Sequence, residues 1–182
     1  MGTADQPLSA QLAVSDFELF GLTQQFALER AALDLRWKEL QRQAHPDKFA
    51  SQGAAAQRVA MQWSVRINEA YQRLKDPLRR AAYLCELGGV PIQAENNTAM
   101  PAAFLMQQMQ WREALDEAQD AAALQSLYEE VKASKRDALA RCEQCLDHSH
   151  DVKQAAQEVR ALMFIERFAH DLEHRIDLFD TH

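Results

Sequence analysis

The chain has 182 residues, of which 47% are hydrophobic and 26% charged, so it has enough apolar material for a folded core. At about 100–200 residues per domain, this length fits one ordinary domain or two small ones. No apolar run approaches the roughly 20 residues that cross a bilayer, and the N-terminus lacks the basic and apolar stretches of a secretory signal. Three cysteines are too few for a disulfide framework and favour a reducing compartment. The sequence therefore predicts a soluble protein of the cytoplasm.

The net charge of −7 lies in one half of the chain. Residues 1–98 hold 11 acidic and 11 basic side chains, whereas residues 99–182 hold 16 acidic and 9 basic ones. Binding to duplex nucleic acid needs a concentrated positive face, and neither half has a net positive charge. The asymmetry favours two modules that bind different partners.

Helix-breaking residues divide the chain near its middle. Only five Gly and five Pro occur, and the stretch richest in turn-forming residues runs from Gly88 to Pro101. The predicted organisation is a flexible tail at 1–15, a first domain at 16–87, a linker at 88–100 and a second domain at 101–180.

Apolar spacing in the first domain is helical, without the sustained alternation typical of strands. Asp16 is expected to cap a short first helix. Trp37 and Trp63 lie on the apolar stripes of two longer helices, which should pack antiparallel and bury both rings between them. The expected helices are 16–21, 26–44, 54–75 and a short 77–87, with a loop at 45–53 joining the two long ones.

The second domain shows three further helical stripes, expected near 101–118, 120–146 and 151–180. Three helices are enough for a bundle, and a helix of about 27 residues is roughly 40 Å long. The predicted fold class is therefore all-α: an antiparallel helical hairpin followed by a C-terminal three-helix bundle.

The tip of the hairpin carries the most distinctive chemistry, at His45, Pro46 and Asp47. Pro46 forces His45 out of the helical region, so the preceding helix ends there and the tip is presented outward. An ordinary proline turn with solvated charges is the alternative. The context favours a binding site, because the tip joins two helices of matched length and its flanks are basic. The basic side chains are Arg36, Arg42 and Lys48.

This arrangement resembles the J-domain, the co-chaperone module that stimulates ATP hydrolysis by DnaK-type chaperones. The resemblance covers residues 16 to about 87 and rests on the His-Pro-Asp triplet, on DFELFGL at 16–22 and on QRQAHPDKF at 41–49. With the helix that contains 104–117 and the bundle after it, the whole chain is similar to the HscB family, the J-type co-chaperones of iron–sulfur cluster biogenesis.

The resemblance implies one partner for each domain. The tip and its basic flank would dock on the specialised DnaK-type chaperone HscA, where Asp47 suits a charge-assisted pair with an arginine and the basic side chains align the encounter. The second domain would deliver the cluster scaffold IscU. No bond is made or broken on such a chain, so we expect no enzymatic activity and no cofactor. It would act by preferring the hydrolysis-competent conformation of the chaperone. The sequence does not fix the oligomeric state, and a monomer is favoured.

The first helix of the second domain is expected to expose apolar side chains. Residues 104, 105 and 106 point about 100° apart and cannot all face one core, and methionine suits an adaptable contact. The resemblance implies that this surface binds IscU, with a carboxylate rim for a basic partner. Gln110 stands where a bacterial relative would often carry Glu, which puts one ion pair of the family pattern in question. The implied scaffold-binding residues are Leu105, Met106, Met109, Glu113, Glu117 and Phe164.

Two groups of residues have metal-like spacing, but neither predicts a metal site. Cys142 and Cys145 form a single Cys-x-x-Cys pair followed by two histidines, which does not supply a four-thiolate site. His170 and His174 match a zinc-peptidase helix but have no downstream third ligand. Two other functions stay open: a helical adaptor with a degenerate J-like module that binds another basic protein, and a small metal-binding protein.

Overall fold

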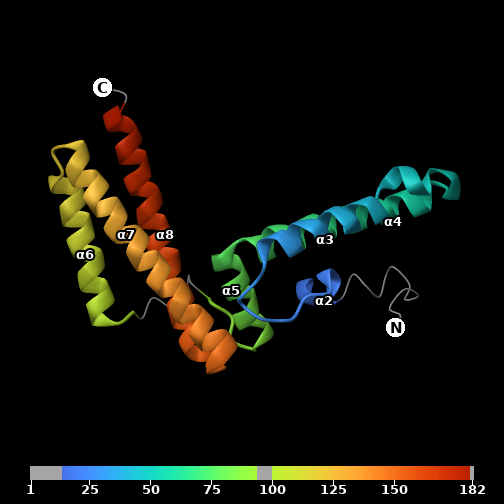
Figure 1. Ribbon diagram of the computed structural model, residues 1–182, viewed down its shortest axis with the longest axis horizontal. Coiled ribbons are helices and arrows are strands. Elements are labelled where there is room, and N and C mark those ends of the chain that lie inside the picture. Colours follow the sequence, from blue (N-terminus) through green and yellow to red (C-terminus); the bar gives the residue numbers. More distant parts are fainter. Residues whose placement is uncertain (1–13, 94–99, 181–182) are drawn as a thin grey trace. The chain divides into compact units, whose positions relative to one another are not determined.

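The computed structural model describes residues 14–93 and 100–180, and every regular element in these ranges is helical, which confirms the all-α fold class. None of these helices is long and apolar enough to span a membrane. In chain order (Figure 1) they are α2 (Asp16–Phe20), α3 (Arg30–Gln43), the 3₁₀ helix η1 (Pro46–Gln52), α4 (Ala54–Lys75), α5 (Pro77–Leu87), α6 (Ala102–Glu117), α7 (Ala121–Glu143), the π turn η2 (Gln144–His148) and α8 (Val152–Asp180).

Two helix ends differ from the sequence prediction for identifiable reasons. Helix α3 begins at Arg30 instead of 26, because the Phe26 carbonyl accepts a 2.8 Å hydrogen bond from the Arg80 guanidinium and Glu29 is extended. Helix α7 ends at Glu143, and the chain continues as a π turn in which the N–H of Ser149 donates to the Gln144 carbonyl at 2.9 Å. The start of α3 and the end of α7 therefore depend on hydrogen bonds that the spacing of apolar residues does not predict.

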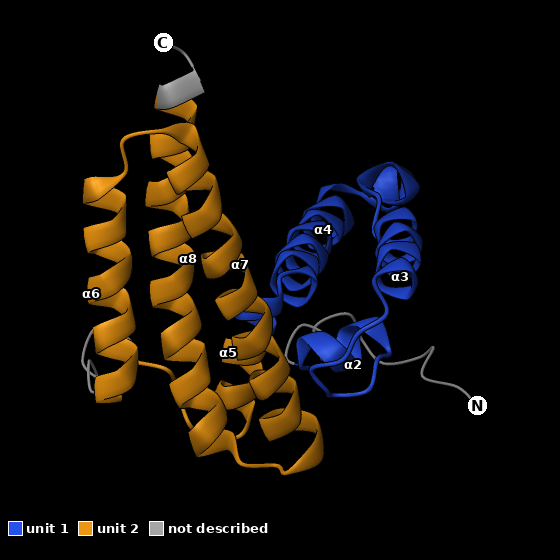
Figure 2. Ribbon diagram, turned by 60° about the vertical axis from the view of Figure 1, so that its left-hand side comes forward, with its two compact units in different colours: residues 1–80 blue, residues 81–182 orange. Residues whose placement is uncertain are grey.

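The chain forms two compact units, Met1–Arg80 and Ala81–His182, which Figure 2 colours blue and orange. The division falls inside α5, ahead of the predicted linker at 88–100. The first residues of that segment are packed against the second unit: a Cβ on Gly88 would lie 2.8 Å from Val152 Cγ1, and the Ile92 carbonyl accepts from the buried Arg160 at 3.2 Å. The stretch up to residue 93 is thus part of the C-terminal unit and not a free linker. Residues 94–99 and most of the predicted tail lie outside the described ranges.

Helices α3 and α4 of the first unit run side by side as a hairpin (Figure 1), as the sequence predicts. The prediction that both tryptophans are buried between them holds for Trp63, which is 5% exposed. It is wrong for Trp37, which is only half-buried. The Trp37 ring stacks on Tyr71 with 4.9 Å between ring centroids, and its Nε1 donates to Asn68 Oδ1 at 2.9 Å. The indole therefore sits at the edge of the core with its polar end bonded.

Helix α2 is fixed to α4 by a buried ion pair. Asp16 was expected to cap this helix, but Ser15 is the cap, and it forms a reciprocal capping box with Glu18. Asp16 is fully buried, with Oδ1 2.7 Å from Arg66 and Oδ2 3.4 Å from Arg73. A carboxylate is stable in such a place only when it is paired, so these two arginines hold α2 in position.

Replacing Asp16 by Asn should lower the free energy of unfolding by about 3 kcal/mol, because it leaves two arginines facing a neutral group. The value is at the low end for a buried pair, since Arg66 and Arg73 remain 19% and 40% exposed. Glu18→Gln is the control, because it alters only the capping box and should cost about 1 kcal/mol or less. Urea denaturation of both variants checks the difference, and equal losses would contradict the role given to Asp16.

The second unit is a bundle in which α7 and α8 pack along each other and α6 packs on α7 (Figure 1). Its centre is Trp111 of α6, which is 1% exposed and stacks on Phe168 of α8 with 5.5 Å between ring centroids. The buried Trp111 Nε1 donates to Glu130 of α7 at 2.7 Å, so its polar atom is satisfied. One residue therefore joins all three helices and fixes which face of α6 turns inward.

Candidate partner-binding surfaces

The His-Pro-Asp tip is exposed and locally rigid. His45 has extended backbone angles (φ −62°, ψ 125°) and precedes Pro46 at the first position of η1, as the proline geometry predicts. The Asp47 N–H donates to His45 Nδ1 at 3.3 Å, which leaves Nε2 to carry the proton of a neutral ring. The Asp47 side chain is 91% exposed, and its Oδ2 lies 3.6 Å from His45 Nδ1. The turn therefore presents a carboxylate and an imidazole outward in a fixed relation.

The three basic residues predicted beside the tip differ in their surroundings. Arg42 and Lys48 are exposed, and no acidic partner is recorded for either among the described residues. Arg36 is half-buried: its Nε donates to the Phe20 carbonyl at 3.2 Å, and its Nη1 contacts Glu39 at 3.1 Å. Arg36 thus also holds α2 against α3, a structural role that the sequence did not indicate. Binding of a partner by these residues remains a prediction.

A polar network that the sequence prediction missed clamps α3 to α4 near the tip. The Gln41 amide donates to Asn68 Oδ1 at 2.8 Å and to the Ser64 carbonyl at 3.2 Å. In return the Ser64 hydroxyl donates to Gln41 Oε1 at 2.7 Å. Gln41 lies four residues before His45, so this network fixes the end of α3 and positions the tip. A single sequence does not indicate that Gln41 of one helix will pair with Ser64 and Asn68 of the other, because polar residues at such positions are common on exposed helix faces.

The apolar surface predicted on the first helix of the second unit is present. Leu105, Met106 and Met109 of α6 are 49%, 62% and 71% exposed, while Trp111 on the same helix is buried. Phe164 of α8 is 41% exposed and belongs to the same surface, because its ring lies 6.2 Å from that of Phe104 in an edge-on contact. We call Leu105, Met106, Met109 and Phe164 the α6 patch.

Carboxylates continue from the α6 patch toward the end of the helix. Glu113 and Glu117 are both exposed, as is Gln110. Met163, beside Phe164, is also 39% exposed, and the sequence prediction did not select it. An exposed apolar centre with charged groups on one side is the usual anatomy of a protein-binding surface.

The cysteines and histidines of the second unit do not converge. Among the described residues, no three His, Cys, Asp or Glu side chains are placed to hold a metal ion. His170 and His174 are exposed on α8, whereas Cys85, Cys142 and Cys145 are buried and free. Burial raises the pKa of Cys85 to about 11 and that of Cys142 to about 12, from an ordinary value of 9.0, and it also raises the pKa of Cys145. Neutral buried thiols are poor metal ligands and poor nucleophiles.

We expect all three thiols to resist iodoacetamide at pH 8 in the folded chain and to react after unfolding in urea. At that pH a thiol with a pKa of about 11 is ionised in roughly one molecule per thousand. Because the pKa values of Cys85 and Cys142 are raised in the folded state, their contribution to stability is present below pH 9.0 and is lost as the pH rises through about 11 to 12. Mass spectrometry counts the labels, and native labelling of any cysteine at the rate of a free thiol would contradict this.

A hairpin with an exposed His-Pro-Asp tip, joined to a helical bundle, places the chain among the J-type co-chaperones. Similarity to known proteins identifies the family within this class. Residues 100–173 match the family model described as the HSCB C-terminal oligomerisation domain. The chain is 51% identical over 170 residues to the co-chaperone protein HscB homolog of Burkholderia multivorans, covering 92% of this chain and 97% of the relative. The relative from Cupriavidus taiwanensis is 50% identical over 173 residues, covering 93% and 98%.

Solved structures agree with these relatives. The chaperone HscB from Vibrio cholerae matches with a TM-score of 0.78 at 37% identity, over 91% of this chain and 99% of that one. The human co-chaperone protein HscB matches with a TM-score of 0.84 at 25% identity, over 94% and 84%. This chain therefore belongs to the HscB co-chaperone family.

Proposed function

We propose that this co-chaperone serves iron–sulfur cluster assembly in the bacterial cytoplasm by bringing the scaffold IscU to the DnaK-type chaperone HscA. The first unit would stimulate the ATPase of HscA, and the α6 patch would hold IscU. The observation that carries the proposal is the exposed tip, where Asp47 projects into solvent while its backbone N–H is fixed to His45. Membership of the HscB co-chaperone family supports this class of function.

The tip suits recognition of a basic group on the chaperone. Asp47 is almost fully exposed, so contact with a partner would desolvate it only as an ion pair forms. A charge-assisted hydrogen bond is stronger and more directional than a neutral one, and an arginine can make it bidentate. Exposed Arg42 and Lys48 would add long-range attraction and raise the association rate more than the affinity. Stimulation would follow if the tip binds the hydrolysis-competent conformation of HscA more tightly than the other.

The α6 patch suits capture of a protein with an apolar and basic surface. Flexible methionines adapt to the shape of a partner, and Leu105 and Phe164 supply stiffer contacts beside them. Glu113 and Glu117 would pair with basic groups at the edge of the interface. The chain would contribute no catalytic group of its own, because neither surface brings together a nucleophile and a base.

A single assay tests the proposal: ATP hydrolysis by HscA, measured with this chain and with and without IscU. We expect stimulation by the chain alone and a further increase when IscU is added. A helical adaptor with a degenerate J-like module would leave the ATPase at its basal rate while still binding a basic protein. The absence of stimulation by folded protein at saturating concentration would therefore overturn the proposal.

A further inference from the structure

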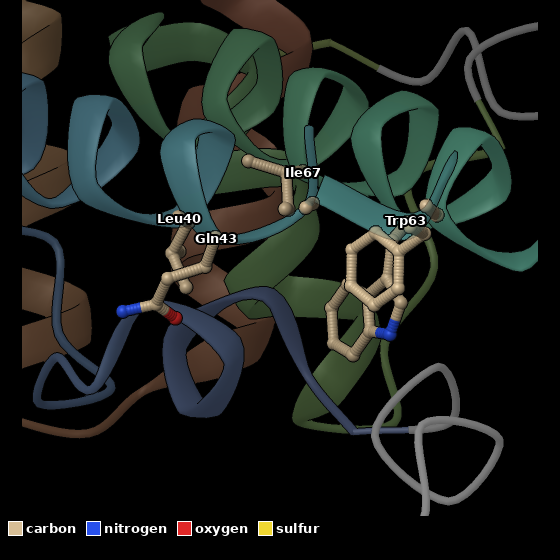
Figure 3. Close-up of a pocket in the computed structure, with 7 residues that line it drawn as sticks. Leu40, Gln43, Trp63 and Ile67 are labelled. Atoms are coloured by element: carbon tan, nitrogen blue, oxygen red, sulfur yellow. The ribbon is translucent and has the colours of Figure 1, made fainter. Parts of the chain in front are cut away.

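Helix α3 buries one side and exposes the other. On the buried side Leu33 is fully enclosed, and Leu40 lines a hollow of about 80 Å³ between α3 and α4 (Figure 3). Leu35 lies about 200° around the helix axis from Leu33, and its side chain is 64% exposed. An open groove of about 530 Å³ lies on this outer side. Its lining residues are Leu35, Trp37, Lys38, Glu39, Gln41 and Arg42.

The outer side of α3 combines an apolar side chain with positive charge. Leu35, Lys38 and Arg42 follow each other at intervals of three and four residues, so they form a row along one side of the helix. Lys38 and Arg42 are exposed. Glu39, which also lines the groove, is paired with Arg36 at 3.1 Å. We call Leu35, Lys38 and Arg42 the α3 row, which begins with an apolar group and continues with two cations toward the tip.

Helix α6 of the second unit carries a row with the same order and the opposite charge. Met109, Glu113 and Glu117 follow each other at intervals of four residues, and we call them the α6 row. Met109 is 71% exposed, and both glutamates are exposed without a recorded cationic partner among the described residues. Asp116 adds a further exposed carboxylate, and Arg112 is the one cation in the sequence of α6. This side of α6 is therefore apolar at its start and net negative beyond it.

The two rows match in length and in order. At 1.5 Å per residue, the α3 row spans about 10.5 Å along its helix axis and the α6 row about 12 Å. If the two helices pack side by side and parallel, Leu35 meets Met109, and each cation of the α3 row meets a glutamate of the α6 row. Two α6 helices packed on each other would instead bring their carboxylates together, and like charges across an interface are unfavourable. The α3 row is thus the better counterpart of the α6 row.

We infer that the chain self-associates, with the α3 row of one copy bound to the α6 row of a second copy. The family model that matches residues 100–173 is described as an oligomerisation domain, which supports self-association without saying which surfaces meet. Each copy carries both rows, so the contact either closes into a dimer with two such interfaces or continues as an open chain. An interface of two short, charged helix faces belongs to the small and transient class, so the monomer favoured by the sequence is the state at low concentration.

The consequence of this contact rests on the proposed function. Arg42 belongs to the surface proposed to dock on HscA, and the α6 row belongs to the surface proposed to bind IscU. Self-association would cover part of both surfaces at once. The chain would therefore be held inactive at high concentration until a partner displaces the second copy by mass action.

Sedimentation velocity of the full chain tests the inference without either partner. We expect the weight-average mass to rise over a hundredfold range of concentration, and the rise to shrink in 0.5 M salt because exposed ion pairs are screened. The rise should be lost in Lys38→Glu/Arg42→Glu and in Glu113→Lys/Glu117→Lys. Arg136→Glu is the control, because it reverses an exposed charge on α7, outside both rows, and it should associate like the parent. A parent chain that stays monomeric at every concentration would overturn the inference.

Mixing the two charge-reversed variants gives the sharper test. Each variant alone sets like charges against each other, whereas the equimolar mixture restores opposite charges in both contacts and should form a 1:1 heterodimer. No association in the mixture would contradict the inference, provided that circular dichroism shows both variants folded. Parent-like association of Lys38→Glu/Arg42→Glu alone would also contradict it, because the contact would then join α6 to α6. Neither outcome bears on the proposed function, which the HscA assay tests at concentrations where the chain is monomeric.

Discussion

Asp47→Asn should abolish stimulation of the HscA ATPase while leaving the affinity for IscU unchanged. The substitution keeps the shape of the side chain and the hydrogen bond from the backbone N–H to His45 Nδ1, and it removes only the negative charge. A hydrogen bond to a charged group contributes about 1.5–3 kcal/mol, so its loss would weaken the encounter roughly 10- to 150-fold. Stimulation would be lost completely if the ion pair between Asp47 and the chaperone is what makes the chain bind the hydrolysis-competent conformation more tightly than the other.

Glu69→Gln is the matched control for this prediction. It also removes one carboxylate from an exposed site on the first unit, but on α4, about four turns from where that helix begins beside the tip. Steady-state ATP hydrolysis measured over a range of co-chaperone concentrations should show parent-like stimulation for Glu69→Gln and the basal rate for Asp47→Asn. Full stimulation by Asp47→Asn would show that the tip is not the activating element.

The features that sequence predicted well are those set by local geometry. Pro46 restricts its own backbone and that of His45, so an exposed turn follows from two residues without knowledge of the fold. Exposure of apolar side chains on α6 follows in the same way, because residues 104, 105 and 106 point about 100° apart and cannot all face one core. The individual members of the α6 patch, including Phe164 of α8, were implied by the family resemblance and not by local geometry. Neither inference required a long-range contact.

The features that sequence missed depend on partners far along the chain. An aspartate before an apolar run is an ordinary helix cap, and only the folded chain shows Asp16 buried against Arg66 and Arg73, about fifty residues away. The sequence predicts that Arg36 belongs to a basic surface, yet its guanidinium donates a hydrogen bond to the Phe20 carbonyl. Trp37 and Trp63 both lie on apolar stripes, yet Trp63 is buried and Trp37 is only half-buried. Such pairings are not encoded in helical periodicity.

Replacing Met106 and Met109 together by alanine should weaken IscU binding by about 1–3 kcal/mol, or roughly 5- to 150-fold in Kd, while ATPase stimulation by the chain alone persists. Both side chains are more than half exposed in the unbound chain, so little core packing is lost and the fold should remain intact. Alanine also keeps the helical preference of these positions. Titration calorimetry with IscU measures the affinity directly, and thermal unfolding checks the stability.

Met61→Ala provides the matched control, because Met61 is 60% exposed on a helix of the other unit. It removes the same kind of side chain from a comparable environment, outside the surface assigned to IscU. If IscU bound non-specifically to any exposed methionine, Met61→Ala would weaken binding by a similar factor. A loss confined to the Met106/Met109 variant would instead locate the binding energy at the α6 patch, whereas parent-like affinity of that variant would exclude these two side chains from the interface.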